Sequence, residues 1–153
     1  MDANGNVTVV RSVFDGNNCP AGIGGAVYMG PGNDNPAPTL VITNCTVSNS
    51  AAQSGAFYAD KTVFTAVTGT AWINNSASIN GAGLFSADTA VVITSSTFVG
   101  NTAPSGIGGG VYLGGDATHS ITNTVFDSNS AYQSVRWQRR ALPLRALTHG
   151  VVL

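Results

Sequence analysis

The chain contains no glutamate, and lysine occurs once among its 153 residues. Charged residues make up 8% of the sequence, far below the roughly 25% that is usual for soluble domains. Glutamate and lysine are common on exposed helices, so their near absence argues against a helical protein. Serine, threonine, asparagine, valine and glycine are abundant instead, and these residues favour strands and turns. The composition therefore predicts an all-β fold.

Long apolar runs are also missing, since no stretch approaches the roughly eighteen consecutive apolar residues of a membrane-spanning helix. The first residues, MDANGNVTVV, lack the basic and apolar regions of a secretory signal, and a strand-forming segment begins almost at once. We therefore expect no transmembrane segment, and we expect the chain to be a fragment of a longer protein. Through Ser134 the chain holds seven Asp against only Arg11 and Lys61. This mildly acidic body predicts no nucleic-acid partner.

The sequence repeats itself in five units, and the stretch GIGGAVYMG at residues 22–30 returns as GIGGGVYLGG at residues 106–115. Each unit has an aliphatic residue five places before a large apolar residue, and an Asn or Ser three places after it. The aliphatic residues are Val9, Ile42, Val67, Ile93 and Ile121; the large apolar residues are Phe14, Val47, Trp72, Phe98 and Phe126; the polar residues are Asn17, Ser50, Asn75, Asn101 and Asn129. The large apolar position recurs at intervals of 33, 25, 26 and 28 residues. Such a period indicates an array in which each unit covers the next.

Two apolar positions five residues apart would face opposite sides of an unbroken strand, so a corner must separate them if both point inward. We therefore predict that residues 1–134 form a parallel β-solenoid, or β-helix, of about five coils with about three short strands per coil. Equivalent residues would stack about 4.8 Å apart. The asparagines would then form a ladder of side-chain amides at a corner, with a gap at Ser50, and the glycine triplets would permit sharp bends.

The segments FDGNNCPAGIGGAVY (residues 14–28) and FVGNTAPSGIGGGVY (residues 98–112) resemble the repeats of the polymorphic outer membrane proteins of chlamydiae. The signatures of those repeats are FxxN and GGA followed by Ile, Leu or Val. FxxN matches residues 14–17, 98–101 and 126–129, and the glycine signature is matched in full by residues 24–27. The resemblance covers residues 7 to about 133 and implies a right-handed parallel β-helix, the passenger of an autotransporter used in adhesion. It also implies a location outside the cell or at its surface, in the outer membrane of a bacterium.

Each of the first four units closes with an aliphatic residue or Phe followed by an aromatic residue. The aromatic residues are Tyr28, Tyr58, Phe85 and Tyr112. Neighbouring residues of a strand face opposite sides, so the aromatics should lie outside if the aliphatic residues lie inside. Such a column could stack on sugars or on a partner protein, or it could simply strengthen the sheet through cross-strand contacts. We regard these four residues as candidates for a binding face.

Four aspartates, Asp34, Asp60, Asp88 and Asp116, follow the closing aromatics by two to six residues. Stacked carboxylates could gather a Ca²⁺ ion, which takes six to eight oxygen ligands. Their unequal offsets favour the simpler interpretation, in which Asp suits a turn. His119 and His149 have no ligand partners at the spacing of a metal site. We therefore expect no cofactor, and a calcium site at Asp60, Asp88 and Asp116 is only a weak hypothesis.

Two cysteines, Cys19 and Cys45, occupy different positions in the repeat, which favours small buried thiols over a bridge, although their pairing stays open. A lyase or glycosidase on this scaffold would need converging acidic and basic groups. Asp15 and Asp127 hold equivalent positions but lie four coils apart, roughly 19 Å at the spacing of stacked strands. We therefore predict a non-enzymatic, adhesin-like module that binds a protein or a glycan. A polysaccharide lyase and a purely structural spacer are the alternatives.

The repeat pattern ends after Gln133, and residues 135–153 have a different composition. Four arginines lie there, Arg136, Arg139, Arg140 and Arg145. We expect an irregular tail, either disordered or produced by a shifted reading frame or a mis-joined exon. The last coil would then lack a cap, and its open strand edges would invite aggregation or end-to-end self-association.

Overall fold

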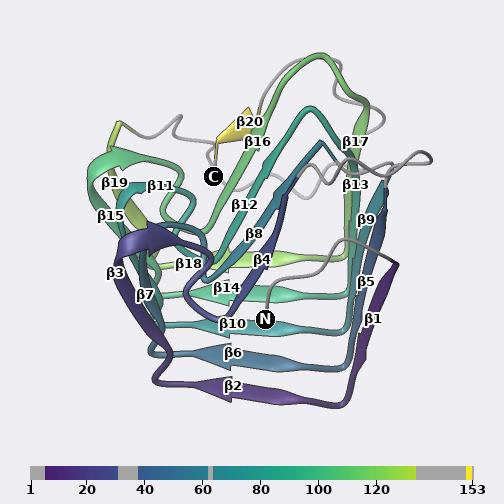
Figure 1. The fold of residues 1–153 in the computed structure, drawn as a ribbon, viewed down its shortest axis with the longest axis horizontal. Coiled ribbons are helices and arrows are strands. Elements are labelled where there is room, and N and C mark those ends of the chain that lie inside the picture. Colours follow the sequence, from purple (N-terminus) through teal and green to yellow (C-terminus); the bar gives the residue numbers. More distant parts are fainter. Residues whose placement is uncertain (1–5, 31–37, 62–63, 134–150, 153) are drawn as a thin grey trace.

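The computed structural model describes residues 6–30, 38–61, 64–133 and 151–152, and these residues form strands and turns without a helix. The chain winds in successive coils that stack on one another (Figure 1). This arrangement confirms the predicted all-β parallel β-solenoid. Its right-handed sense stays a prediction from the resemblance.

The strands form four sheets of five strands each. The first sheet contains β1 (Val7–Val10), β5 (Thr39–Thr43), β9 (Phe64–Thr68), β13 (Ala90–Thr94) and β17 (His119–Thr122). The second contains β2 (Val13–Asp15), β6 (Thr46–Ser48), β10 (Ala71–Ile73), β14 (Thr97–Val99) and β18 (Val125–Asp127). The third contains β3 (Asn18–Ile23), β7 (Ala51–Ser54), β11 (Ser76–Asn80), β15 (Thr102–Ile107) and β19 (Ser130–Gln133). The fourth contains β4 (Val27–Met29), β8 (Phe57–Asp60), β12 (Leu84–Ala87), β16 (Val111–Gly114) and β20 (Val151–Val152).

The described residues make four complete coils and a fifth of three strands, β17 to β19. The predicted number of three strands per coil is wrong, because each complete coil contains four. The chain turns at the polar corner that follows the large apolar residue, and it turns again at the glycine corner. The segment of small residues between these two corners is therefore a separate strand, the third of each coil. The predicted non-repeat tail, residues 135–153, lies outside the described residues except for β20, which pairs antiparallel with β16.

Neighbouring coils keep a constant register in the first, second and fourth sheets, whereas the register shifts in the third. There the segment from Cys19 to Ile23 pairs with the shorter segment from Ala52 to Ser54. The coils therefore differ in length within the third sheet and still bring their corners into line.

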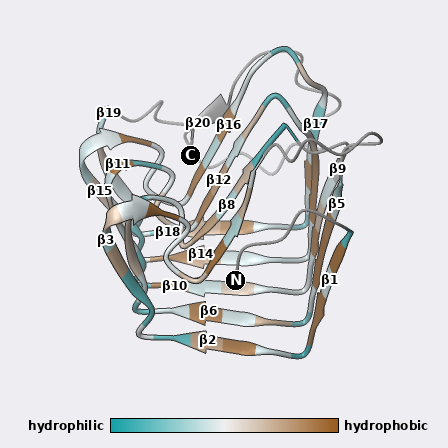
Figure 2. Cartoon of the chain, viewed as in Figure 1, coloured by the Kyte–Doolittle hydropathy of each residue, from teal (hydrophilic) through white to brown (hydrophobic). Residues whose placement is uncertain are grey.

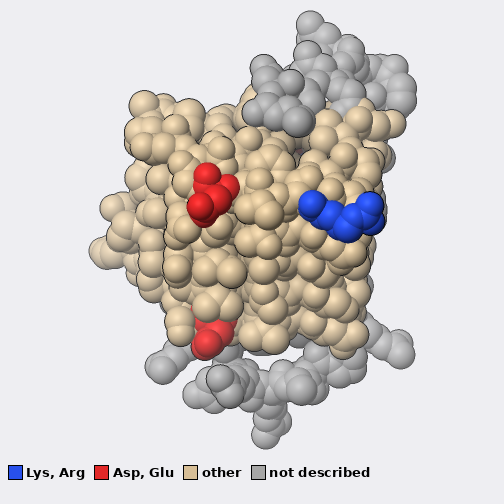
Figure 3. All heavy atoms as spheres, turned by 90° about the horizontal axis from the view of Figure 1, so that it is seen from below, with Lys and Arg blue, Asp and Glu red and all other residues tan. Residues whose placement is uncertain are grey.

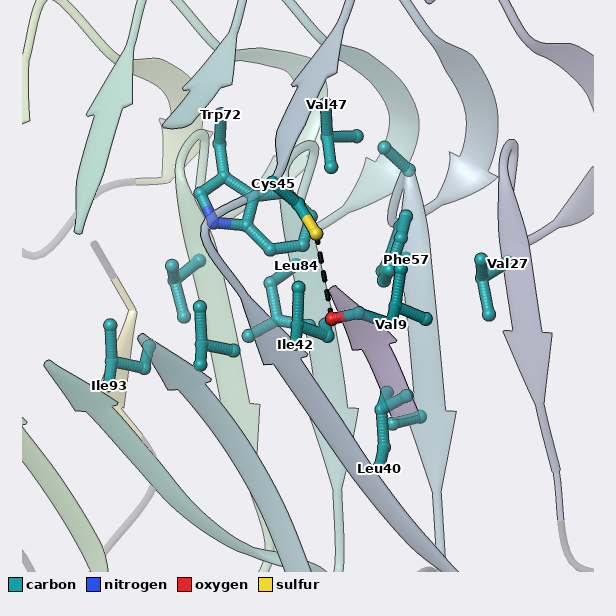
Figure 4. Packing of buried hydrophobic residues seen from close by; sticks show 14 of the residues in the cluster. Val9, Val27, Leu40, Ile42, Cys45, Val47, Phe57, Trp72, Leu84 and Ile93 are labelled. Atoms are coloured by element: carbon teal, nitrogen blue, oxygen red, sulfur yellow. Dashed lines mark hydrogen bonds between the residues drawn. The ribbon is translucent and has the colours of Figure 1, made fainter. Parts of the chain in front are cut away.

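Columns of apolar side chains fill the interior, with one residue from each coil. The register places Val9 beside Ile42 and Ile42 beside Val67, as the aliphatic repeat predicted. Apolar residues recur along each sheet in Figure 2. Those of the inner coils are fully buried, among them Ile42, Val47, Val67, Trp72, Leu84, Ile93 and Phe98. Figure 4 shows this packing, including Cys45, whose Sγ lies 3.6 Å from the carbonyl oxygen of Val9.

Aromatic rings extend the core along the second sheet. The rings of Trp72 and Phe98 are stacked with centroids 5.5 Å apart, and Phe126 stacks on Phe98 at 4.9 Å. Phe57 meets Trp72 edge-on at 5.1 Å and Phe14 edge-on at 5.0 Å. Because the rings belong to successive coils, each coil contributes apolar area that only its neighbours can cover.

A residue with left-handed backbone conformation lies at the corners of the coil. At the first corner these residues are Arg11, Asn44, Gly69, Ser95 and Asn123; at the second they are Gly16, Asn49, Asn74, Gly100 and Ser128; at the third they are Gly24, Gly55, Gly81 and Gly108. The left-handed residue of the second corner precedes the ladder asparagine, which is not itself left-handed. At the third corner glycine is required, since a Cβ on Gly55 would collide with the carbonyl oxygen of Phe57.

The predicted asparagine ladder is present at the second corner. Asn75 Nδ2 donates to Asn101 Oδ1 at 2.9 Å, and Asn101 Nδ2 donates to Asn129 Oδ1 at 2.9 Å. The ladder stops at Ser50, whose hydroxyl donates to Ser48 of its own coil at 3.0 Å. The gap predicted there is therefore real, although the Ser50 backbone N–H still donates to Asn75 Oδ1 at 3.0 Å.

A second ladder, which the sequence analysis missed, runs along the first corner. Its members are Ser12, Cys45, Thr70, Ser96 and Thr124. The backbone N–H of each of the first four donates to the side-chain oxygen or sulfur of the next coil, as Thr70 N does to Ser96 Oγ at 3.2 Å. Each hydroxyl in turn donates to the carbonyl two residues back, as Thr70 does to Thr68 at 3.1 Å. We call these five residues the hydroxyl ladder.

Candidate functional site

The outer face of the fourth sheet carries a continuous stack of four aromatic rings, which we call the aromatic column: Tyr28, Tyr58, Phe85 and Tyr112. Their strands β4, β8, β12 and β16 keep a constant register, so the four residues lie opposite one another. Neighbouring ring centroids are 5.6, 4.6 and 4.8 Å apart in this order. The last two pairs are nearly parallel, with interplanar angles of 5° and 9°.

The column lies outside the solenoid, as the alternation of side chains predicted. Val27, Phe57, Leu84 and Val111 precede the four aromatics and are 0% exposed, so they point inward. The three tyrosines are half-buried, and Phe85 is 9% exposed. The rings cover each other's faces, so that the column presents ring edges and phenol hydroxyls to the outside.

Two glycines make room for the rings, one directly after β4 and one at the end of β16. Gly30 and Gly114 each lie two residues after a column tyrosine and thus on the same face of the strand. A Cβ on Gly30 would collide with the Tyr28 hydroxyl, and one on Gly114 would approach the Tyr112 hydroxyl to 2.9 Å. The tyrosine rings therefore extend along their strands over these glycines.

One hydroxyl of the column, that of Tyr58, feels the charge of a nearby acidic group. Burial, followed by the negative charge of Asp60 and the neighbouring Tyr28, raises the pKa of Tyr58. Burial also raises the pKa of Asp60, against the opposing effect of Lys61, and the charge of Asp88 adds to the rise. The Tyr58 hydroxyl, protonated at neutral pH even at the ordinary tyrosine pKa of 10.0, can donate a hydrogen bond.

The aspartates of the calcium hypothesis do not share one register position. Asp60 lies opposite Ala87, and Ala87 lies opposite Gly114, so Asp88 and Asp116 are displaced along the chain from this row. Within the described ranges, His, Cys and Asp side chains form no group of three that could hold a metal ion. Asp34 lies outside the described residues. The turn interpretation fits Asp88, whose backbone is left-handed, and Asp116, both of which lie in bends, whereas Asp60 is the last residue of β8.

Asp15 and Asp127 end one outward column of the second sheet, in which Asp15, Ser48, Ile73, Val99 and Asp127 lie side by side. Their separation by four coils is thus as predicted. Asp15 accepts hydrogen bonds from Ser48 Oγ at 2.7 Å and from Asn49 Nδ2 at 2.8 Å. These bonds lower the pKa of Asp15. The carboxylate is therefore tied to the neighbouring coil.

Both cysteines are free thiols; Cys45 is buried in the hydroxyl ladder, whereas Cys19 is half-buried. His119 is fully buried, and both its ring nitrogens lack a hydrogen-bond partner. Burial lowers the pKa of His119. It stands at the end of an interior row after Leu40, Thr65 and Val91. His149 lies outside the described residues.

The part of the surface that the described residues form carries little charge. The view in Figure 3 shows isolated acidic and basic side chains on a largely uncharged face. The described residues contain no helix with the length and apolar character of a membrane span. The chain matches no family model, no curated protein and no solved structure. The likeness to polymorphic outer membrane protein repeats therefore remains a resemblance.

Proposed function

We propose that the chain is a non-enzymatic, adhesin-like module of a secreted or cell-surface protein, and that it binds a protein partner through the aromatic column. The observation that carries this proposal is the uninterrupted stack of four rings on the outside of the fourth sheet. The constant register of the fourth sheet holds the side chains in one row, so little conformational entropy is lost when a partner binds.

The orientation of the rings favours a protein over a sugar. A sugar stacks on the face of an aromatic ring, but neighbouring rings cover every face in this column apart from the outer faces of Tyr28 and Tyr112. The ring edges carry positive partial charge and the tyrosine hydroxyls donate and accept hydrogen bonds, so the column suits carbonyl groups and polar side chains. A glycan remains the alternative ligand, and its binding would be seen in the same experiment.

The test is to apply the full chain to arrays of extracellular proteins and of glycans. The decisive variant replaces Tyr28, Tyr58 and Tyr112 by Phe, which the column already accommodates at Phe85. It removes three hydroxyls and keeps the stack. A matched control, Thr46→Val with Thr97→Val, removes hydroxyls from the outward face of the second sheet.

We expect the wild type and the control to bind the same proteins, and the tyrosine variant to bind them at least tenfold more weakly. This size corresponds to about 1.4 kcal/mol, close to the net value of one or two hydrogen bonds. If the chain bound glycans and no protein, the proposed partner would be a glycan instead of a protein. A folded wild type that binds neither class would refute the proposal and leave the structural spacer.

A further inference from the structure

The contacts between coils have a direction. At both polar corners the backbone N–H of one coil donates to a side-chain acceptor of the following coil. Asn75 N donates to Asn101 Oδ1 and Asn101 N to Asn129 Oδ1, each at 3.0 Å, and Ser96 N donates to Thr124 Oγ1 at 3.4 Å. In these two ladders the fifth coil therefore ends with backbone donors and the first coil with side-chain acceptors, while the backbone bonds between strands run in both directions.

The fifth coil ends both rows of donors. Thr124 and Asn129 are the last members of their ladders, and within the described ranges no sixth coil follows. At the opposite end Ser12 begins the hydroxyl ladder. Its hydroxyl donates to Val10 O at 2.9 Å, as every inner hydroxyl donates to the carbonyl two residues back. The Ser12 oxygen thus has the orientation in which Thr70 and Ser96 accept a bond from the preceding coil.

Both end coils also leave apolar side chains partly uncovered. Phe14 and Phe126 are half-buried, whereas Val47, Trp72 and Phe98 between them are 0% exposed. Ile121 is likewise half-buried at the end of a column whose inner members are fully buried. The two end coils are nearly identical around the phenylalanine, since residues 13–17 read VFDGN and residues 125–129 read VFDSN.

We propose that the partner of these two ends is a second copy of the chain, so that the fifth coil of one molecule docks on the first coil of the next. Continuing the register places Phe126 against Phe14, Thr124 N–H against Ser12 Oγ and Asn129 N–H against Asn17 Oδ1. The second and third sheets carry the joint together with the Ile121 end of β17, since His119 at the start of β17 is already fully buried and β20 lies beside β16 in the fourth sheet. Because the two surfaces differ, the contact is heterologous and repeats into a linear filament.

One feature of the joint opposes association. The same register brings Asp127 beside Asp15 of the next copy, as Asp15 lies beside Ser48 within one chain. The bonds from Ser48 and Asn49 hold the Asp15 carboxylate toward the second coil, away from the joint. Two exposed like charges still repel, so association should strengthen as salt screens them, and Asp127→Asn should strengthen it at low salt.

The test is analytical ultracentrifugation of the full chain over a range of concentrations. An acceptor-end variant carries Ser12→Ala and Asn17→Ala, and a donor-end variant carries Ile121→Lys, which would place an unpaired charge in the joint. The control is Thr46→Ala with Thr97→Ala, two outward positions away from both ends. Circular dichroism establishes that each variant is folded.

We expect wild type and control to form a concentration-dependent series of oligomers. The acceptor-end variant should associate roughly 25-fold more weakly, as two lost hydrogen bonds imply at about a factor of five each. Each end variant alone should be largely monomeric at concentrations where wild type polymerises, and an equal mixture of the two should form one-to-one dimers through their intact ends. A monomeric wild type, a closed dimer, or a folded variant that polymerises like wild type would overturn the proposal.

Discussion

Replacing Asn101 by Ala should destabilise the solenoid more than any exposed Asn→Ala change, because Asn101 uses its whole hydrogen-bonding capacity in the interior. Its side chain donates to Asn129 Oδ1 and Trp72 O and accepts from the backbone and side-chain N–H groups of Asn75. These bonds use two donors and two acceptor positions, all that an amide side chain has. Asn101 is 0% exposed, so water cannot replace them.

The magnitude follows from the groups left behind. Asn101→Ala leaves the Asn75 backbone N–H and the Trp72 carbonyl without their side-chain partners in a buried environment. Asn75 Nδ2 keeps its bond to Val47 O at 2.9 Å, and Asn129 is only half-buried, so both are affected less. An unsatisfied buried group costs about 1–3 kcal/mol, which for two groups predicts a loss of about 4 kcal/mol.

The assay is urea unfolding followed by far-ultraviolet circular dichroism, with the free energy of unfolding extrapolated to water. Asn18→Ala, an exposed position in the first coil, is the matched control and should change this free energy by less than about 0.5 kcal/mol. A loss of under about 1 kcal/mol for Asn101→Ala would show that the amide ladder does not hold the coils together, and the reasoning from it would fail.

Three further outcomes test the ladder, the core and the surface. Ser50→Asn should fill the gap beside Asn75 and raise the free energy of unfolding by about 1 kcal/mol, measured in the same urea series. His119→Leu should make the protein more stable than wild type in acid. Burial lowers the pKa of His119 from its usual 6.5, so the folded protein favours the neutral imidazole. Wild type therefore keeps its full stability above pH 6.5 and loses stability as the pH falls below 6.5, whereas the variant does not. The difference from the variant should grow by up to about 1.4 kcal/mol per pH unit, and equal pH profiles would contradict this. Ser48→Ala should raise the pKa of Asp15 toward its usual 3.8, measured by an NMR titration of the carboxyl group, and an unchanged pKa would exclude the hydrogen bond as the main cause.

The fold was predictable because every coil of a solenoid packs in the same way, so that the same kinds of residue recur at the same positions. The aliphatic residues and the asparagines recur at fixed steps, and the structure puts them in the columns that this recurrence indicated. The number of strands per coil was not predictable in the same way. Strands of three residues, such as β2 and β6, contain too few side chains to show an alternation, and the corners between them are single left-handed residues of varied type.

The hydroxyl ladder could have been found, since Ser, Thr or Cys stands two places before every large apolar residue. Its members are chemically varied, and serine and threonine are common in this chain, so the pattern is easily overlooked. The outward position of the aromatic column followed from strand alternation, but the covering of ring faces depends on spacing and rotamers that sequence does not specify. Likewise, no sequence pattern marks His119 as a buried imidazole without partners.

The shifting register of the third sheet makes this scaffold tolerant of insertion at a defined place. Between Ala77 and Asn80 and between Ala103 and Ile107 the coils already differ in length, yet the ladders on either side stay aligned. Insertions of different length and sequence can therefore be accepted in the third sheet of successive coils, along one ridge of the solenoid, without a change in the core. That ridge is a suitable site for grafting a foreign peptide in regularly spaced copies.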